Sequence, residues 1–135
     1  MNNIDELLEA VGVYFDAIYF CDVARLDRVF HEGSSLFDAD NGEIFVDPIA
    51  SFRADVGSRP APSERSQVRS DEIISIDWLS AISAVVKLRL QSHENVFVDH
   101  LSFVKGKSGW KIVAKVWHLE RTAEVLEEGQ RSQSG

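Results

Sequence analysis

A carboxylate stands in the middle of the most apolar strand that the sequence predicts. In the segment NVFVDHLSF (95–103), alternate side chains share one face, which places Asp99 among three bulky apolar neighbours, Phe97, Leu101 and Phe103. A buried charge without a partner is strongly unfavourable, so Asp99 must be protonated, paired, or facing a cavity that admits water or a ligand. Two interpretations stay open: a structural pair inside the core, or a polar group in a binding pocket.

The last predicted strand supplies two further candidates for such a pocket. Strict alternation over residues 110–120 places Val116 and His118 on the face of Ile112, with His118 near the pocket mouth, and it places Trp117 on the opposite face. Trp117 is then a candidate dimer contact, with plain core packing as the alternative. The four histidines lack the spacing of a metal site, and no phosphate-binding glycine motif is present, so neither a metal nor a cofactor is predicted.

The elements that must position these residues are a helical first third and a β-rich remainder. Apolar steps of three and four residues predict a helix over about 3–20, and Asp22 is a favourable N-cap for a second helix that Gly33 would end. The DNG turn at 40–42 predicts two short strands around it, and Asp47 followed by Pro48 predicts a third helix over about 48–57. Four strands follow, over 68–79, 83–92, 95–106 and 110–120, and their short connections require antiparallel neighbours.

This order of elements predicts an α+β fold, with three N-terminal helices packed on one face of a mainly antiparallel sheet. Both faces of the strands are rich in apolar residues. We therefore expect a homodimer that forms through the open sheet face. Residues 1–120 form one predicted domain, and the polar tail 121–135 is expected to be flexible.

Composition excludes several classes of partner. The net charge of −8 argues against binding to nucleic acid or to an anionic membrane. The single cysteine, Cys21, excludes an intramolecular disulfide and fits a reducing compartment. The sequence shows neither a membrane-spanning apolar run nor a basic, signal-like N-terminus, so we expect a cytoplasmic protein.

Four segments carry a resemblance to a known family by their order and spacing: YFDAIYFCDVARLDRVFH (14–31), RPAPSER (59–65), IISID (73–77) and FVDHLSFVKGKSGWKIVAKVWH (97–118). Together they resemble a nuclear transport factor 2-like domain of the SnoaL type, most closely its putative lumazine-binding subgroup. The resemblance implies a cystatin-like cone, in which three helices and a curved sheet enclose a pocket. The subgroup's name implies a pteridine-like ligand.

Ketosteroid isomerases share that fold, and three of their positions match Tyr14, Asp38 and Asp99. This second resemblance implies that Asp38 is a base that abstracts a proton, while Tyr14 and Asp99 stabilise the oxyanion. The sequence departs from those enzymes at Ala39, where they carry proline. Asp38 could equally serve the DADNG turn, and Tyr14 could be a core tyrosine with its hydroxyl bonded to the backbone.

The preferred hypothesis is a pocket protein for a small hydrophobic or ring-shaped ligand. The residues expected to contact the ligand come from the first helix, the first strand and the last two strands: Tyr14, Asp38, Asp99, Leu101, Val116 and His118. One alternative is a cofactor-free isomerase, cyclase or dehydratase that moves protons on a carbonyl or polyketide-like substrate. Another alternative is a dimerisation scaffold without a ligand.

Overall fold

The computed structural model describes residues 4–126. In this part of the chain three helices precede or interrupt the strands: α1 (Ile4–Tyr19), α2 (Val23–Val29) and α3 (Ile49–Ser58). A short 3-10 turn, η1 (Pro62–Arg65), follows α3. The strands are β1 (Phe30–Asp38), β2 (Phe45–Pro48), β3 (Asp71–Ser80), β4 (Ser83–Ser92), β5 (Asn95–Gly106) and β6 (Gly109–Thr122).

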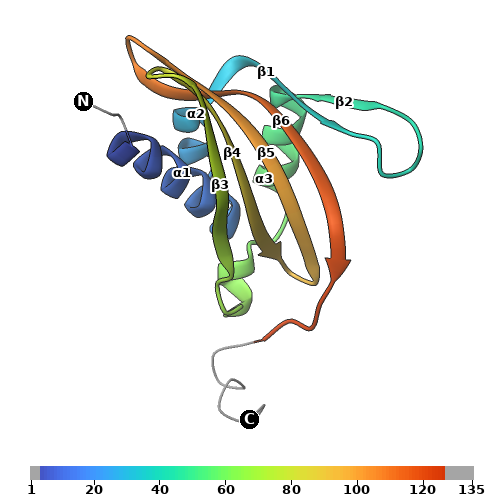
Figure 1. Ribbon diagram of the computed structural model, residues 1–135. Coiled ribbons are helices and arrows are strands. Elements are labelled where there is room, and N and C mark those ends of the chain that lie inside the picture. The colour runs from blue at the N-terminus through green and yellow to red at the C-terminus, as the bar shows by residue number, and fades with distance from the viewer. Residues whose placement is uncertain (1–3, 127–135) are drawn as a thin grey trace.

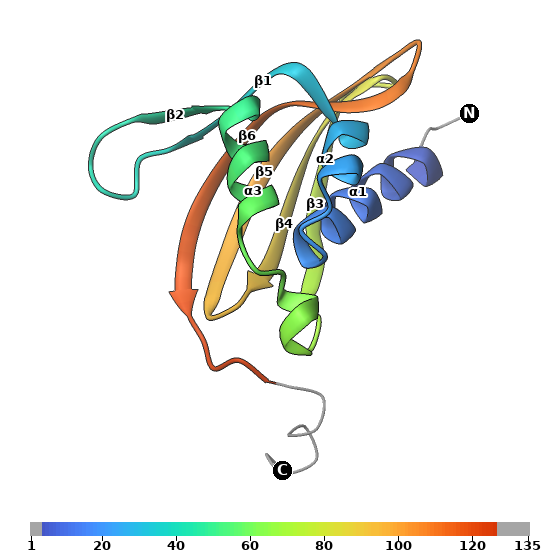
Figure 2. The same ribbon diagram turned by 180° about the vertical axis from the view of Figure 1, so that it is seen from behind.

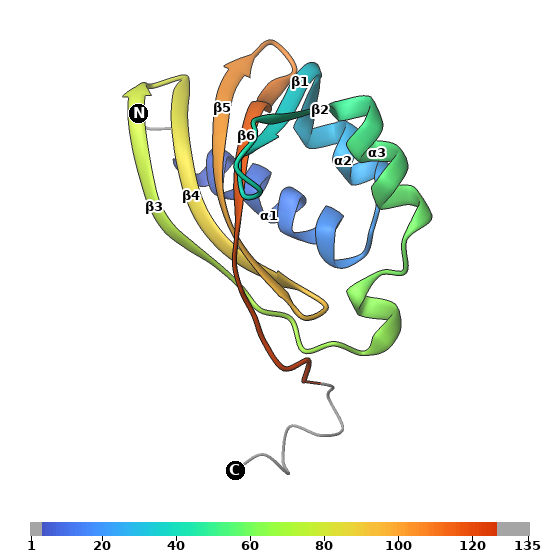
Figure 3. The ribbon, with the colours of Figure 1, turned by 90° about the vertical axis from the view of Figure 1, so that its right-hand side faces the viewer.

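The strands form one curved sheet with the order β2-β1-β6-β5-β4-β3. All neighbours are antiparallel except β1 and β6, which are parallel. The three helices lie on the concave face of the sheet, which is turned to the viewer in Figure 2. The opposite face is open, as the views in Figures 1 and 3 show. The predicted α+β architecture is confirmed.

Helix α1 is held on the sheet by an apolar stripe that recurs at helical spacing. Its buried side chains are Leu7, Val11, Tyr14, Phe15, Ala17 and Ile18. They belong to one core with inward-facing residues of β4 and β5, which include Val86, Leu88, Leu101 and Phe103. This packing places the Tyr14 side chain against the middle of the sheet.

The start of the sheet differs from the sequence prediction. Asp22 caps α2 as predicted, since its Oδ1 accepts a hydrogen bond from the Ala24 N–H at 3.0 Å. The helix ends at Val29, not at Gly33, because buried Phe30 is already extended and pairs with Ile112 of β6. Pairing with a distant strand therefore decides where α2 ends.

A β-bulge in β6 decides which of its side chains face the helices. Pairing with β5 passes from Phe103–Ile112 to Ser102–Ala114, which leaves Val113 as an extra residue. The extra residue reverses the alternation, so Lys115 turns to the helices. Val116 and His118 turn to the open face, and Trp117 turns inward. The predicted orientation of these three side chains is wrong for this reason.

The last strand ends two residues later than the predicted one. β6 runs to Thr122, and the N–H of Ala123 donates a hydrogen bond to the Glu94 carbonyl at 2.8 Å. The N–H of Val68 donates to the Leu126 carbonyl at 2.7 Å. Residues 127–135, the remainder of the predicted flexible tail, lie outside the described residues. Over residues 4–126, none of the helices has the length and apolar character needed to cross a membrane.

Candidate ligand-binding site

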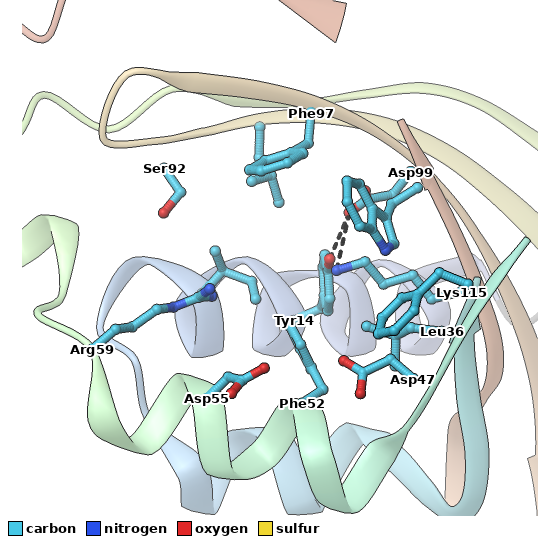
Figure 4. Close-up of a pocket in the computed structure, with 14 residues that line it drawn as sticks. Tyr14, Leu36, Asp47, Phe52, Asp55, Arg59, Ser92, Phe97, Asp99 and Lys115 are labelled. Atoms are coloured by element: carbon cyan, nitrogen blue, oxygen red, sulfur yellow. Dashed lines mark hydrogen bonds and ion pairs between the residues drawn. The ribbon is translucent and has the colours of Figure 1, made fainter. Parts of the chain in front are cut away.

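A pocket of about 260 Å³ lies between the concave face of the sheet and helices α1 and α3 (Figure 4). Its apolar lining is mostly aromatic and comprises Phe45, Phe52, Phe97 and Trp117 with Ile18, Leu36 and Leu90. Its polar lining comprises Tyr14, Asp47, Asp55, Arg59, Ser92, Asp99 and Lys115. Ligand pockets commonly span about 300–1,000 Å³. This one therefore suits a small ligand of one or two rings.

A buried cluster of Tyr14, Asp99 and Lys115 forms one wall of the pocket. The Tyr14 hydroxyl donates a hydrogen bond to Asp99 Oδ2 at 2.5 Å, and Lys115 Nζ lies 3.9 Å from the same oxygen (Figure 4). Asp99 is 1% exposed and Lys115 is 7% exposed. Asp99 Oδ1 has no hydrogen-bond partner among the described residues. Asp99 is therefore paired with the Lys115 ammonium and the Tyr14 phenol, and it also lines the pocket.

Lys115 reaches this wall because of the bulge at Val113. Its ammonium lies over two aromatic rings, 4.6 Å from the centroid of Phe52 and 5.3 Å from that of Tyr14. Burial lowers the pKa of Lys115 below its ordinary 10.5, and the attraction of Asp99 opposes part of that shift. Lys115 was not predicted as a site residue. The signal in the sequence was that a buried Asp99 needs a cation; the pairing of Lys115 with Leu101, two residues from Asp99 on β5, follows from the bulge.

The state of the Tyr14 phenol leads to a prediction for alkaline pH. Burial, followed by the charge of Asp99 and the hydrogen bond to it, raises the pKa of Tyr14 well above its ordinary 10.0. Tyr14 is the only tyrosine in a Tyr19→Phe variant, because the chain has two tyrosines. We expect the ultraviolet absorbance of tyrosinate in this variant to appear above pH 10.0 in the folded protein, and near pH 10.0 in denaturant.

The sign of the accompanying stability change follows from proton linkage. Above pH 10.0 the unfolded chain loses the phenol proton while the folded chain keeps it. The contribution of Tyr14 to the free energy of unfolding is therefore full below pH 10.0 and is lost as the pH rises through the folded-state pKa. Half-titration of the folded variant at or below pH 10.0 would contradict the hydrogen-bonded, buried geometry.

The pocket contains two of the six residues expected to contact a ligand, Tyr14 and Asp99. Asp38 does not line it; its Oδ2 accepts a hydrogen bond from the Asp40 N–H at 3.3 Å, which is the alternative turn role. Leu101 is fully buried in the core. Val116 and His118 lie on the open face, where His118 Nδ1 is 2.6 Å from Asp40 Oδ1. Tyr14, Asp38 and Asp99 therefore do not converge on this pocket.

Besides Lys115, two acidic lining residues, Asp47 and Asp55, were not predicted as part of a site. Asp47 was expected to cap α3, but Pro48 occupies the N-cap and Asp47 turns into the pocket. Asp55 and Arg59 come from α3 and the residue that follows it. Their contribution depends on how α3 lies across the sheet, for which the sequence gives no local signal. Within residues 4–126, no group of three or more His, Cys, Asp or Glu side chains could hold a metal ion.

Solved structures with the same arrangement define the class of fold. A nuclear transport factor 2-like protein of unknown function from Silicibacter pomeroyi matches with a TM-score of 0.77 and 23% identity, covering 87% of this chain and 96% of that one. A similar protein from Shewanella baltica has a TM-score of 0.75 and 18% identity, with coverages of 86% and 92%. A ketosteroid isomerase-like protein from Erwinia carotovora has a TM-score of 0.63 and 13% identity, with coverages of 85% and 94%. The fold is nuclear transport factor 2-like.

The sequence defines the family within this fold. Residues 2–118 match the family described as "Putative lumazine-binding", and the chain belongs to it. No curated protein matches the chain significantly.

Proposed function

We propose that the protein binds a small, flat ring compound in the pocket between α1, α3 and the sheet. The observation that carries this proposal is the combination of four aromatic lining residues with a buried Tyr14–Asp99–Lys115 cluster. Aromatic rings favour a flat ligand through stacking, and a few convergent polar groups fix its orientation. The family description supports a ligand of the lumazine type.

Proton-transfer catalysis has weaker support. The ketosteroid isomerase resemblance needs Asp38 within reach of the same ligand as Tyr14 and Asp99, and Asp38 lies outside the pocket lining. The Tyr14 hydroxyl also donates its hydrogen to Asp99 and is not free to donate to a substrate oxyanion. A binding role requires neither feature.

Filling the pocket tests the proposal. Ser92 is buried and lines the pocket, so a Ser92→Trp variant places a large ring where the ligand would lie. We expect lumazine to bind the wild-type protein in isothermal titration calorimetry. We expect the Ser92→Trp variant to show no heat of binding at the same concentrations, because its indole occupies the volume of the ligand.

A matched variant separates blocking from misfolding. Ser75 is exposed on β3 and lies outside the pocket lining, so Ser75→Trp introduces the same side chain without filling the pocket. Lumazine should bind Ser75→Trp as it binds the wild type, and it should raise the unfolding temperature of both proteins. If lumazine bound Ser92→Trp and the wild type equally well, its binding site would lie outside this pocket.

We also infer that two copies of the chain associate through the open sheet face. The support is a group of valines on strands β4 to β6 that stay 38–51% exposed: Val85, Val104, Val113 and Val116. Among residues 4–126 the helices cover the other face, so a second molecule seated on the open face would remove these side chains from water. The helix-covered pocket of each copy would remain accessible.

A further inference from the structure

The charges around the pocket limit the polarity of the ligand. Three carboxylates, those of Asp47, Asp55 and Asp99, and two cationic side chains, those of Arg59 and Lys115, line the pocket. Its formal charge is therefore minus one when all five are ionised. A ligand that brings a further negative charge would raise the electrostatic energy of the site, whereas a neutral or cationic ligand would not.

Lys115 offers hydrogen-bond donors to a ligand. None of the residues 4–126 accepts a hydrogen bond from its Nζ, and the Asp99 oxygen at 3.9 Å is beyond hydrogen-bonding distance. Buried polar groups normally have a hydrogen-bond partner. The rings of Tyr14 and Phe52 lie under the ammonium, and Lys115 also lines the pocket. A ligand oxygen that reaches Nζ would therefore supply an acceptor.

Asp47 and Asp55 offer acceptors to the same ligand. They come from β2 and α3 and line the pocket beside Phe52 (Figure 4). Among the described residues, neither carboxyl group takes part in a side-chain hydrogen bond or ion pair. Ligand N–H groups could donate to both of them without displacing a protein partner.

We propose that the ligand is a neutral or cationic nitrogen heterocycle with a ring carbonyl, whose oxygen accepts a hydrogen bond from Lys115 Nζ while ring or amino N–H groups face Asp47 and Asp55. This inference rests on the proposed function and adds the ligand's polarity and orientation. It implies that carboxylates, phosphates and other anions bind this pocket more weakly than neutral or cationic rings.

Three flat probes test the polarity in calorimetric titrations. Lumazine has ring carbonyls and N–H groups, quinoxaline has a bicyclic ring without either, and a lumazine carboxylic acid adds an anion. The wild-type protein should bind lumazine about 10- to 100-fold more tightly than quinoxaline, the range expected for a hydrogen bond to a charged donor. The carboxylic acid should bind more weakly than lumazine, and Asp47→Asn/Asp55→Asn should recover part of that loss.

A Lys115→Met variant assigns the preference to the ammonium. Its affinity for quinoxaline should fall much less than its affinity for lumazine, so its preference for lumazine should drop about 10-fold or more and leave the part that Asp47 and Asp55 supply. The variant removes a buried charge, so circular dichroism must show that it is folded at the assay temperature; the three-probe comparison on the wild type stands without it.

The outcomes separate this inference from the proposed function. Equal affinities for lumazine and quinoxaline, or tighter binding of the carboxylic acid, would overturn the inference. If Ser92→Trp still abolished quinoxaline binding, the pocket would remain a ring-binding site. If neither ring bound the wild-type protein, both the proposed function and this inference would fail.

Discussion

Replacing Lys115 with methionine is expected to lower the free energy of unfolding by about 3–5 kcal/mol, the usual cost of removing one partner of a buried ion pair. The carboxylate of Asp99 is 1% exposed and would keep only the Tyr14 hydroxyl as a partner. With so little of the carboxylate exposed, water in the pocket replaces only part of the lost interaction with the ammonium. Urea denaturation monitored by tryptophan fluorescence measures the change.

A double-mutant cycle separates the ion pair from the packing of the side chains. In Asp99→Asn/Lys115→Met no charge is left buried, so the double variant should lose clearly less than the sum of the two single losses. Lys107→Met is the matched control, because Lys107 is exposed in the turn between β5 and β6. This control should change the free energy of unfolding by no more than about 0.5 kcal/mol. Strict additivity of Asp99→Asn and Lys115→Met would show that the two groups are not coupled.

The sequence predicted the fold well because its signals are local and repeated. The apolar stripe of α1, the Asp22 cap and four long strands with short connections each specify an element, and their order allows few arrangements. The predicted strands at 83–92 and 95–106 coincide with β4 and β5. Asp99 was identified correctly as an inward-facing acid because β5 keeps strict alternation around it.

The candidate site was predicted only in part, because β6 does not keep that alternation. A single extra residue at Val113 exchanges the two faces from Ala114 to Leu119, and neither a glycine nor a proline marks it. The prediction therefore selected Val116 and His118, whereas Lys115 and Trp117 line the pocket. Asp47, Asp55 and Arg59 depend on the position of α3 over the sheet, which tertiary packing determines.

An aspartate at position 116 is expected to separate a homodimer into monomers. Val116 is 51% exposed on β6, in the open face, where it pairs with His100 of β5; the exposed Val85 and Val104 lie further along the same face. Arg89, paired with Glu72 and Glu120, lies on the same face close to Val116, so apolar and charged side chains alternate over this part of the face. Burying a carboxylate at this position in place of a valine should cost about 3 kcal/mol and weaken association about a hundredfold.

Sedimentation velocity over a range of protein concentrations measures this association. The matched control is Leu79→Asp, which places the same charge on a side chain that is 86% exposed at the end of the edge strand β3. We expect the wild type and Leu79→Asp to sediment as dimers and Val116→Asp as a monomer, with all three folded. Lumazine should still bind the Val116→Asp monomer, because the pocket lies on the other side of the sheet from position 116. A monomeric wild type, or a dimer that tolerates aspartate at this position, would leave the valines of the open face without the partner that we infer.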